Sequence, residues 1–167
     1  MTGSSRPVIL EACVETIQQG LLAEENHANR IEFCHRLDLG GVTPDHELIR
    51  TAVNTMKIPL KIMIRPRGGD FIYSDSEVDR MKSDIKYCKS IGVEEVVLGA
   101  LNKNGEVDNR LTQMLANLAS PMKVTFHKAI DSVNNFMSSL KTLSTMENID
   151  SVLTSGTKEN AGWKRVY

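Results

Sequence analysis

Two cysteines stand at equivalent places in two short segments, Glu11-Ala12-Cys13 and Glu32-Phe33-Cys34. Residues two apart on a β-strand share a face, so each glutamate would point to the same side as its cysteine. Neighbouring parallel strands lie about 4.8 Å apart, which would let the two sulfurs share one ion. Thiolates are soft ligands that favour Cu(I), Zn or Fe–S centres over hard cations. The alternative is that both cysteines pack as small apolar side chains.

A second group of residues is charged, and its members stand at or just after the ends of predicted strands. Besides the two glutamates it contains Arg65, Arg67, Asp70, His127 and Asp131. Arg65 and Arg67 could clamp a carboxylate or phosphate with their planar forks. His127 with Asp131 or a glutamate could do general acid–base work. The alternative is mutual neutralisation inside the fold, for example of Arg65 by Glu32, because buried charges need partners.

A repeating strand–helix pattern must position these side chains. Predicted strands begin near residues 8, 30, 59, 94, 122 and 149, with an amphipathic helical pattern after each of the first five. Helix starts are predicted from the capping box of Ser74 to Glu77, from Asp108, and from Thr43-Pro44 as N-cap and first helical residue. The first strand is predicted to begin at Val8. This alternation predicts an α/β chain with a parallel sheet.

Alternation within the strands indicates which parallel sheet this is. Apolar Ile62 and Ile64 alternate with Lys61, Met63 and Arg65. A doubly wound sheet has continuously apolar strands, whereas a barrel needs one apolar face for its helices and admits polar groups inside. We therefore predict a TIM-type (β/α) barrel. Since such barrels take about 250 residues, a chain of 167 holds about six of the eight βα units.

The expected organisation is a single (β/α)-barrel domain over residues 1–167, truncated at its C-terminus and open, with residues 1–7 disordered. The unpaired edges of an open sheet favour pairing between copies of the chain, so a homo-oligomer is a predicted partner state. Cys88, Met114 and Met137 are predicted to pack in the core from helix faces, and Leu21 and Leu22 to lie on a buried stripe.

The amino-acid composition argues against several classes of protein. Twenty lysines and arginines balance 21 acidic residues, for a net charge of −1, which argues against nucleic acid and anionic membranes as partners. No apolar run approaches the roughly 20 residues of a membrane span. No long apolar segment precedes Val8, so we do not expect a secretory signal. Three cysteines do not make a disulfide framework. We expect a cytoplasmic protein, with the nucleus as an alternative.

Several segments together resemble the CutC copper homeostasis family. The most specific is Arg65-Pro66-Arg67-Gly68-Gly69-Asp70-Phe71, and matches extend from about residue 8 to 156. The resemblance implies a (β/α) barrel and intracellular Cu(I) binding in copper homeostasis, with Cys13 and Cys34 as the metal ligands. Lys128 stands where the family commonly has arginine, and the family continues through two more βα units after Gly156.

Two functions of different classes therefore remain. The first is a copper-binding protein with Cys13 and Cys34 as ligands and the two glutamates behind them. The second is an enzyme of unknown substrate, using a polar pocket at the barrel rim for a small carboxylate or phosphate. A third reading is a truncated form with no activity of its own.

Overall fold

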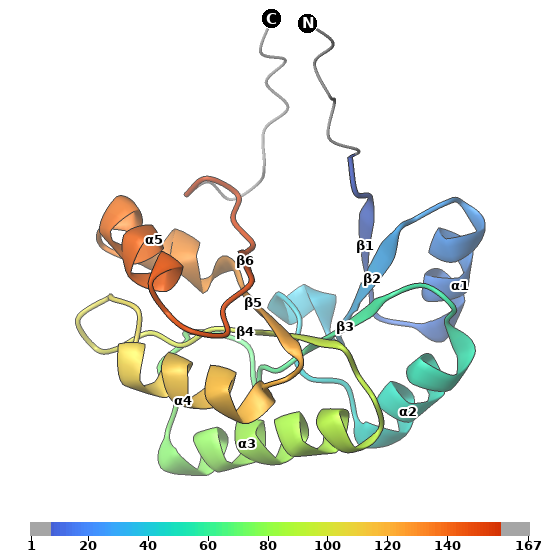
Figure 1. Ribbon diagram of the computed structural model, residues 1–167, viewed down its shortest axis with the longest axis horizontal. Helices are drawn as coiled ribbons and strands as arrows, with labels where there is room; N and C mark the ends of the chain where they lie inside the picture. Colours follow the sequence, from blue (N-terminus) through green and yellow to red (C-terminus); the bar gives the residue numbers. More distant parts are fainter. Residues whose placement is uncertain (1–7, 158–167) are drawn as a thin grey trace, which may run out of the picture.

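Six parallel strands in sequence order form one sheet in the computed structural model, which describes residues 8–157 (Figure 1). The strands are β1 Glu11–Val14, β2 Arg30–Phe33, β3 Leu60–Met63, β4 Glu95–Leu98, β5 Lys123–Phe126 and β6 Ser151–Val152. Each pairs in parallel with the next. Within the described residues, β1 does not pair with β6. The sheet is therefore an open half-barrel, which confirms the predicted fold class.

Five α-helices connect the strands and lie on the outer side of the sheet (Figure 1). They are α1 Ile17–Glu25, α2 His46–Thr55, α3 Asp75–Ser90, α4 Asn109–Ala119 and α5 Phe136–Ser144. Short 3₁₀ helices follow β2 and β5 at Leu37–Leu39 (η1) and Lys128–Ser132 (η2). The disorder predicted for residues 1–7 lies outside the described residues, and self-association through the strand edges stays a prediction.

An apolar core fills the space between the helices and the outer face of the sheet. Fully buried Ile31, Phe33 and Ile62 on the strands pack with Met81 and Ile85 of α3 in one cluster. Cys88 of α3 belongs to the same cluster, as predicted. The helix stripes were partly wrong. Leu21, Leu22, Met114 and Met137 are exposed, because each points away from the sheet on its helix.

Local start signals were confirmed at two helices and wrong at a third. Ser74 and Glu77 form the capping box of α3, and Asp108 caps α4. The helix predicted from Thr43-Pro44 begins instead at His46, because Asp45 accepts the cap hydrogen bond. Thr43 has another role: its hydroxyl donates to the carbonyl of Arg65 and accepts from the Arg65 amide, at 3.1 and 2.8 Å. The loop after β2 is thereby tied to the end of β3.

The first strand also begins later than predicted, at Glu11. Val8, Ile9 and Leu10 are exposed, because β1 is an edge strand and no described element covers the segment before it. The backbone of Leu10 still contacts the neighbouring segment, with its amide donating to Asn29 Oδ1 at 2.7 Å.

Charged side chains on the inner face of the sheet form a paired layer. Lys61 of β3 is 2% exposed, and its Nζ lies 3.2 Å from Glu11 and 2.8 Å from Glu95. It also donates to Thr125 Oγ1 at 3.0 Å, while Arg30 pairs with Glu11. This layer joins β1 to β5 through side chains. The polar inner face expected from the strand alternation is present.

Candidate functional site

The two predicted metal-binding cysteines meet on the inner face of the sheet. Cys13 lies on β1 and Cys34 follows directly after β2, and their Sγ atoms are 3.8 Å apart. Cys34 is completely buried and its thiol points to the carbonyl of Val14 at 3.6 Å, whereas Cys13 is exposed. Both are free cysteines. Their proximity follows from the parallel register, in which Cys13 pairs with Glu32 and Val14 with Phe33, so that Cys34 comes directly after the paired segment.

Glu32 completes the immediate surroundings of the pair. Its Oε1 accepts from the Cys13 thiol at 3.7 Å, and the residue is only 3% exposed. Burial raises the pKa of Glu32 to about 7, with the charge of Glu11 adding to the effect and Lys61 opposing it. The hydrogen bond to Cys34, together with burial and the nearby Glu32, raises the pKa of Cys13 far above its ordinary value. The Cys13 thiol is thus protonated at neutral pH, and a metal ion must displace its proton.

A cavity of about 560 Å³ opens beside Cys13 and extends from the start of β1 to the residues that follow β3 and β5. The predicted residues that line it are Glu11, Cys13, Glu32, Arg65 and His127. Its other walls come from Ile9, Leu10, Leu37, Gly40, Met63, Phe71, Lys128 and Leu153. Five of the predicted residues therefore share one cavity. Glu11 was predicted near the C-terminal end of its strand, but it is the first residue of β1, where it pairs with Arg30 and Lys61.

His127 follows β5 and is 3% exposed. Its Nδ1 accepts from the amide of Ala129 at 3.2 Å, which places the ring proton on Nε2. Nε2 has no hydrogen-bond partner within the described residues. Burial, with the charge of Arg65, lowers the pKa of His127 to about 3. Gly99 makes room for this ring, since a Cβ there would lie 2.6 Å from it.

Arg65 does not pair with Glu32, so the predicted neutralisation is wrong. Its Nη1 donates to the carbonyls of Leu39, Gly40 and Gly41 at 3.1–3.2 Å, and its Nη2 donates to Gly69 at 2.8 Å. The guanidinium therefore fastens two loops to the end of β3. Phe71 joins it to the histidine, with Arg65 Cζ 4.7 Å from the Phe71 ring centroid and the His127 ring centroid at 5.0 Å.

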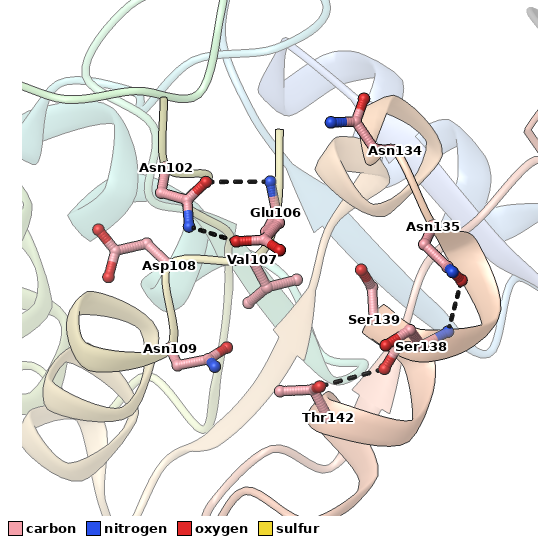
Figure 2. A pocket seen from close by; sticks show the side chains of 10 residues that line it. All are labelled: Asn102, Glu106, Val107, Asp108, Asn109, Asn134, Asn135, Ser138, Ser139 and Thr142. Atoms are coloured by element: carbon pink, nitrogen blue, oxygen red, sulfur yellow. Dashed lines mark hydrogen bonds between the residues drawn. The ribbon is translucent and has the colours of Figure 1, made fainter. Parts of the chain in front are cut away.

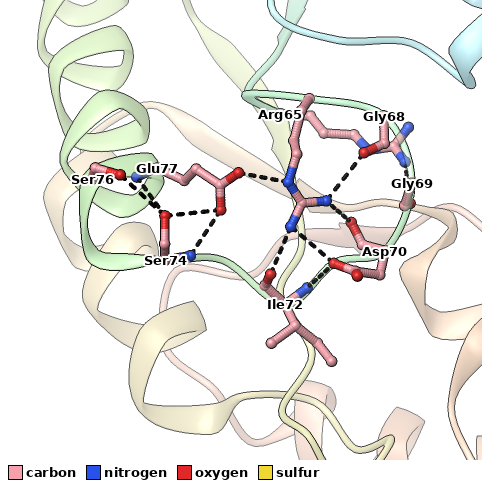
Figure 3. A network of polar contacts seen from close by, with 9 residues as sticks. Arg65, Gly68, Gly69, Asp70, Ile72, Ser74, Ser76 and Glu77 are labelled. Atoms are coloured by element: carbon pink, nitrogen blue, oxygen red, sulfur yellow. Dashed lines mark hydrogen bonds and ion pairs between the residues drawn. The ribbon is translucent and has the colours of Figure 1, made fainter.

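Arg67 and Asp70 lie outside the cavity. Both belong to a polar network in the loop that leads to α3, where Figure 3 labels Asp70 and Glu77. Arg67 pairs with Glu77 at 2.5 Å and with Asp70 at 2.9 Å. The Arg67 guanidinium holds the pKa of Asp70 below its usual range. The two-arginine clamp predicted from sequence is not formed, because the guanidinium of Arg67 is occupied by its own loop.

Asp131 does not pair with His127 either. Its carboxylate accepts from the Thr154 hydroxyl at 2.5 Å and from the amides of Ser155 and Thr157, both at 2.9 Å. It therefore fixes the segment after β6 against η2. The predicted acid–base pair is not assembled, since His127 Nδ1 is taken by a backbone amide.

The sequence analysis did not identify three inner-face residues as neighbours of the site, namely Lys61, Glu95 and Thr125. They form the paired layer beneath the cysteines. The signal was available, because Lys61 and Thr125 alternate with apolar residues that face the helices. A polar residue at such a position in an otherwise apolar strand is a candidate partner for an inward charge.

A second hollow, of about 360 Å³, lies between the loop before α4 and the start of α5 (Figure 2). Several of its polar groups are hydrogen-bonded to one another. Asn102 contacts Glu106, and Asn135 accepts the amide of Ser138 at 3.0 Å. None of the residues predicted to be functional lines it, so the cavity at the cysteines is the candidate site.

Two further observations bear on the type of site. Within residues 8–157, no three His, Cys, Asp or Glu side chains are grouped so that they could hold a metal ion. The same residues include no helix with the length and apolar character needed to span a membrane.

The comparisons of this chain with known protein sequences identify the same family. The sequence profile of the CutC family matches residues 8–165. The human copper homeostasis protein cutC homolog is 40% identical over 159 residues, which cover 95% of this chain and 58% of that protein. A family protein CutC of Pasteurella multocida is 40% identical over 152 residues, covering 91% and 62%. The chain thus spans about three-fifths of the length of these relatives.

Solved structures support the fold. A CutC protein of Streptococcus agalactiae superimposes with a TM-score of 0.83 at 28% identity, over 91% of this chain and 75% of that one. A dihydrodipicolinate synthase variant matches with a TM-score of 0.63 at 10% identity, over 86% of this chain and 52% of that one, and shows only the shared barrel architecture. The profile match over nearly the whole chain and the identities near 40% lead to one conclusion: the chain belongs to the CutC family.

Proposed function

We propose that this chain binds Cu(I) through Cys13 and Cys34 and acts in copper homeostasis. The observation that carries the proposal is the 3.8 Å separation of the two sulfurs, of which Cys13 lines an accessible cavity and Cys34 is buried next to it. Soft thiolate ligands select Cu(I). The names of the human and mouse relatives, which describe copper homeostasis proteins, support the same role.

The ligand set favours Cu(I) over a structural zinc ion. Structural zinc normally takes four Cys or His ligands in a tetrahedron. Within the described residues only two cysteines meet here, and His127 is turned to a backbone amide through its Nδ1. A pair of thiols of which one, Cys13, opens onto a cavity suits an ion that is taken up and released.

Replacing Cys13 or Cys34 by serine is expected to abolish most Cu(I) uptake, because the two sulfurs act as a unit. The double replacement should add little to either single change. Copper analysis and competition titration with a Cu(I) chelator, under anaerobic reducing conditions, measure stoichiometry and affinity. Cys88→Ser is the matched control, since Cys88 is buried in the helix–sheet core. Unchanged copper affinity in the double variant would contradict the proposal.

A second candidate function is binding of a small organic anion in the same cavity. It is favoured by the unpartnered Nε2–H of His127, because a buried donor without an acceptor costs free energy that a ligand oxygen would recover. The cations of Arg65 and Lys128 share this wall, while Leu37, Phe71 and Leu153 supply apolar surface. This composition suits a short monocarboxylate.

If this second function holds, short-chain monocarboxylates should raise the melting temperature of the protein more than chloride does at equal ionic strength. Lys128→Gln should reduce the shift, since it removes a cation from the cavity wall. Inorganic phosphate in a parallel series distinguishes the two anion classes. Melting curves that are the same with every anion would exclude this candidate and leave the copper proposal untouched.

A further inference from the structure

A third sulfur lies beside the cysteine pair. Met63, the last residue of β3, is 5% exposed and forms a buried cluster with Cys34 and Val97 on the inner face of the sheet. It also lines the same cavity as Cys13. Side chains from β1, from the residue after β2 and from β3 thus bring three sulfur atoms together on the inner face of the sheet, with Cys13 and Met63 at the cavity and Cys34 completely buried.

The strand register explains why Met63 and Cys34 are neighbours. Glu32 pairs with Lys61 and Phe33 with Ile62, so the next step along both strands places Cys34 beside Met63. Both side chains point inward, because they alternate with Phe33 and Ile62, which are buried in the core on the other face. The neighbourhood is therefore fixed by backbone pairing.

Gly41 closes over these sulfurs from the loop after η1. A Cβ at this position would lie 3.4 Å from Cys34 Sγ and 3.6 Å from the terminal methyl carbon of Met63. The backbone of Gly41 also has a φ of +84°, which disfavours any side chain. The loop thus packs directly on Cys34 and on the end of the Met63 thioether.

The spacing of the cysteines leaves room for a third donor. Metal–thiolate bonds are roughly 2.3 Å long, so two sulfurs bound on opposite sides of an ion would stand about 4.6 Å apart. At the observed 3.8 Å, bonds of that length enclose an angle of roughly 110°. An ion held in this bent arrangement has an open side.

We propose that the Met63 thioether is the third ligand of the Cu(I) ion held by Cys13 and Cys34, an inference that rests on the proposed copper binding. Thioethers and thiolates are both soft ligands, and together they select Cu(I). The methionine side chain has three rotatable bonds, so its sulfur can turn toward the ion without movement of β3.

Glu32 is the competing donor, with Oε1 3.7 Å from Cys13 Sγ. Its carboxylate oxygen suits hard cations such as Mg²⁺ and Ca²⁺ better than it suits Cu(I). A thioether ligand also has a consequence for specificity. Zinc is bound by cysteine, histidine and carboxylates, so a Cys₂Met site should prefer Cu(I) to Zn²⁺.

The test is Met63→Leu, a change that nearly conserves volume and is expected to leave the fold intact. The variant should still bind one Cu(I) through its cysteines, with affinity lowered by about tenfold or more in a chelator competition. Its preference for Cu(I) over Zn²⁺ should fall as well. Met81→Leu is the matched control, because Met81 is a fully buried methionine on the helix side of the sheet.

X-ray absorption at the copper edge supplies an independent readout. In selenomethionine-labelled protein, a copper–selenium scattering path is expected in the parent and in Met81→Leu, and it should vanish in Met63→Leu. Equal copper affinity in Met63→Leu, or no copper–selenium path in the parent, would overturn the third ligand while leaving the cysteine site standing. Failure of the parent to bind Cu(I) at all would instead reject the proposed function.

Discussion

Replacing Lys61 by methionine is expected to lower the free energy of unfolding by about 3 kcal/mol, because the change leaves the half-buried Glu95 without its cation and removes one of the two cations that pair with Glu11. Lys61 is 2% exposed and lies between Glu11 and Glu95, at 3.2 and 2.8 Å. Methionine fills a similar space, so the loss measures the missing charge. Urea unfolding at pH 7 gives the difference.

Lys123→Met is the matched control. Lys123 lies on β5, two strands away in the same sheet, but is exposed, so the same change there should alter the free energy of unfolding by no more than about 0.5 kcal/mol. Similar, small losses in both variants would show that the inner layer of ion pairs does not hold the open sheet together.

Acid is expected to destabilise the protein through His127. The pKa of this histidine is lowered to about 3 in the fold, whereas in the unfolded chain it is about 6.5. The unfolded state therefore takes up a proton first, and stability that is complete above pH 6.5 is lost as the pH falls toward 3. At pH 5 the loss amounts to about 2 kcal/mol.

His127→Asn should remove this component while keeping the cap, because the Asn side-chain oxygen can accept the Ala129 amide as Nδ1 does. The measurement is the difference in unfolding free energy between pH 7 and pH 5, which should be about 2 kcal/mol smaller in the variant. His35→Asn, at an exposed position after β2, is the control and should behave as the parent. If the parent and His127→Asn lose equal stability on acidification, His127 does not bind its proton in the way inferred here.

Local patterns proved sufficient for much of the fold. The alternation of Lys61, Met63 and Arg65 with Ile62 and Ile64 predicted the two faces of β3, since side chains on a strand alternate strictly. Caps at Ser74 and Asp108 were also predictable, because a capping hydrogen bond spans only three residues. The helix start predicted at Thr43-Pro44 was wrong, because Asp45 caps the helix instead. Thr43 is hydrogen-bonded to the backbone of Arg65, which lies far from it in the sequence.

Pairings between distant residues could not be predicted in this way. The sequence placed Arg65, Arg67 and His127 at strand ends but could not show what each side chain contacts. Arg65 is held by loop carbonyls and Arg67 by Glu77, because both loops fold back on the end of β3. Those contacts depend on loop geometry, which short-range spacing does not encode.

The sequence alone determined the order of strands and helices, the inward side of each strand and the presence of two equivalent Glu–Cys segments. Only the tertiary structure decided that the sulfurs lie 3.8 Å apart, that Met63 joins them, and that Arg67 and Asp131 are turned to other partners. The physical reason is that alternation and capping act over a few residues along the chain. The stagger between parallel strands and the path of their loops are instead set by how the whole sheet packs against its helices.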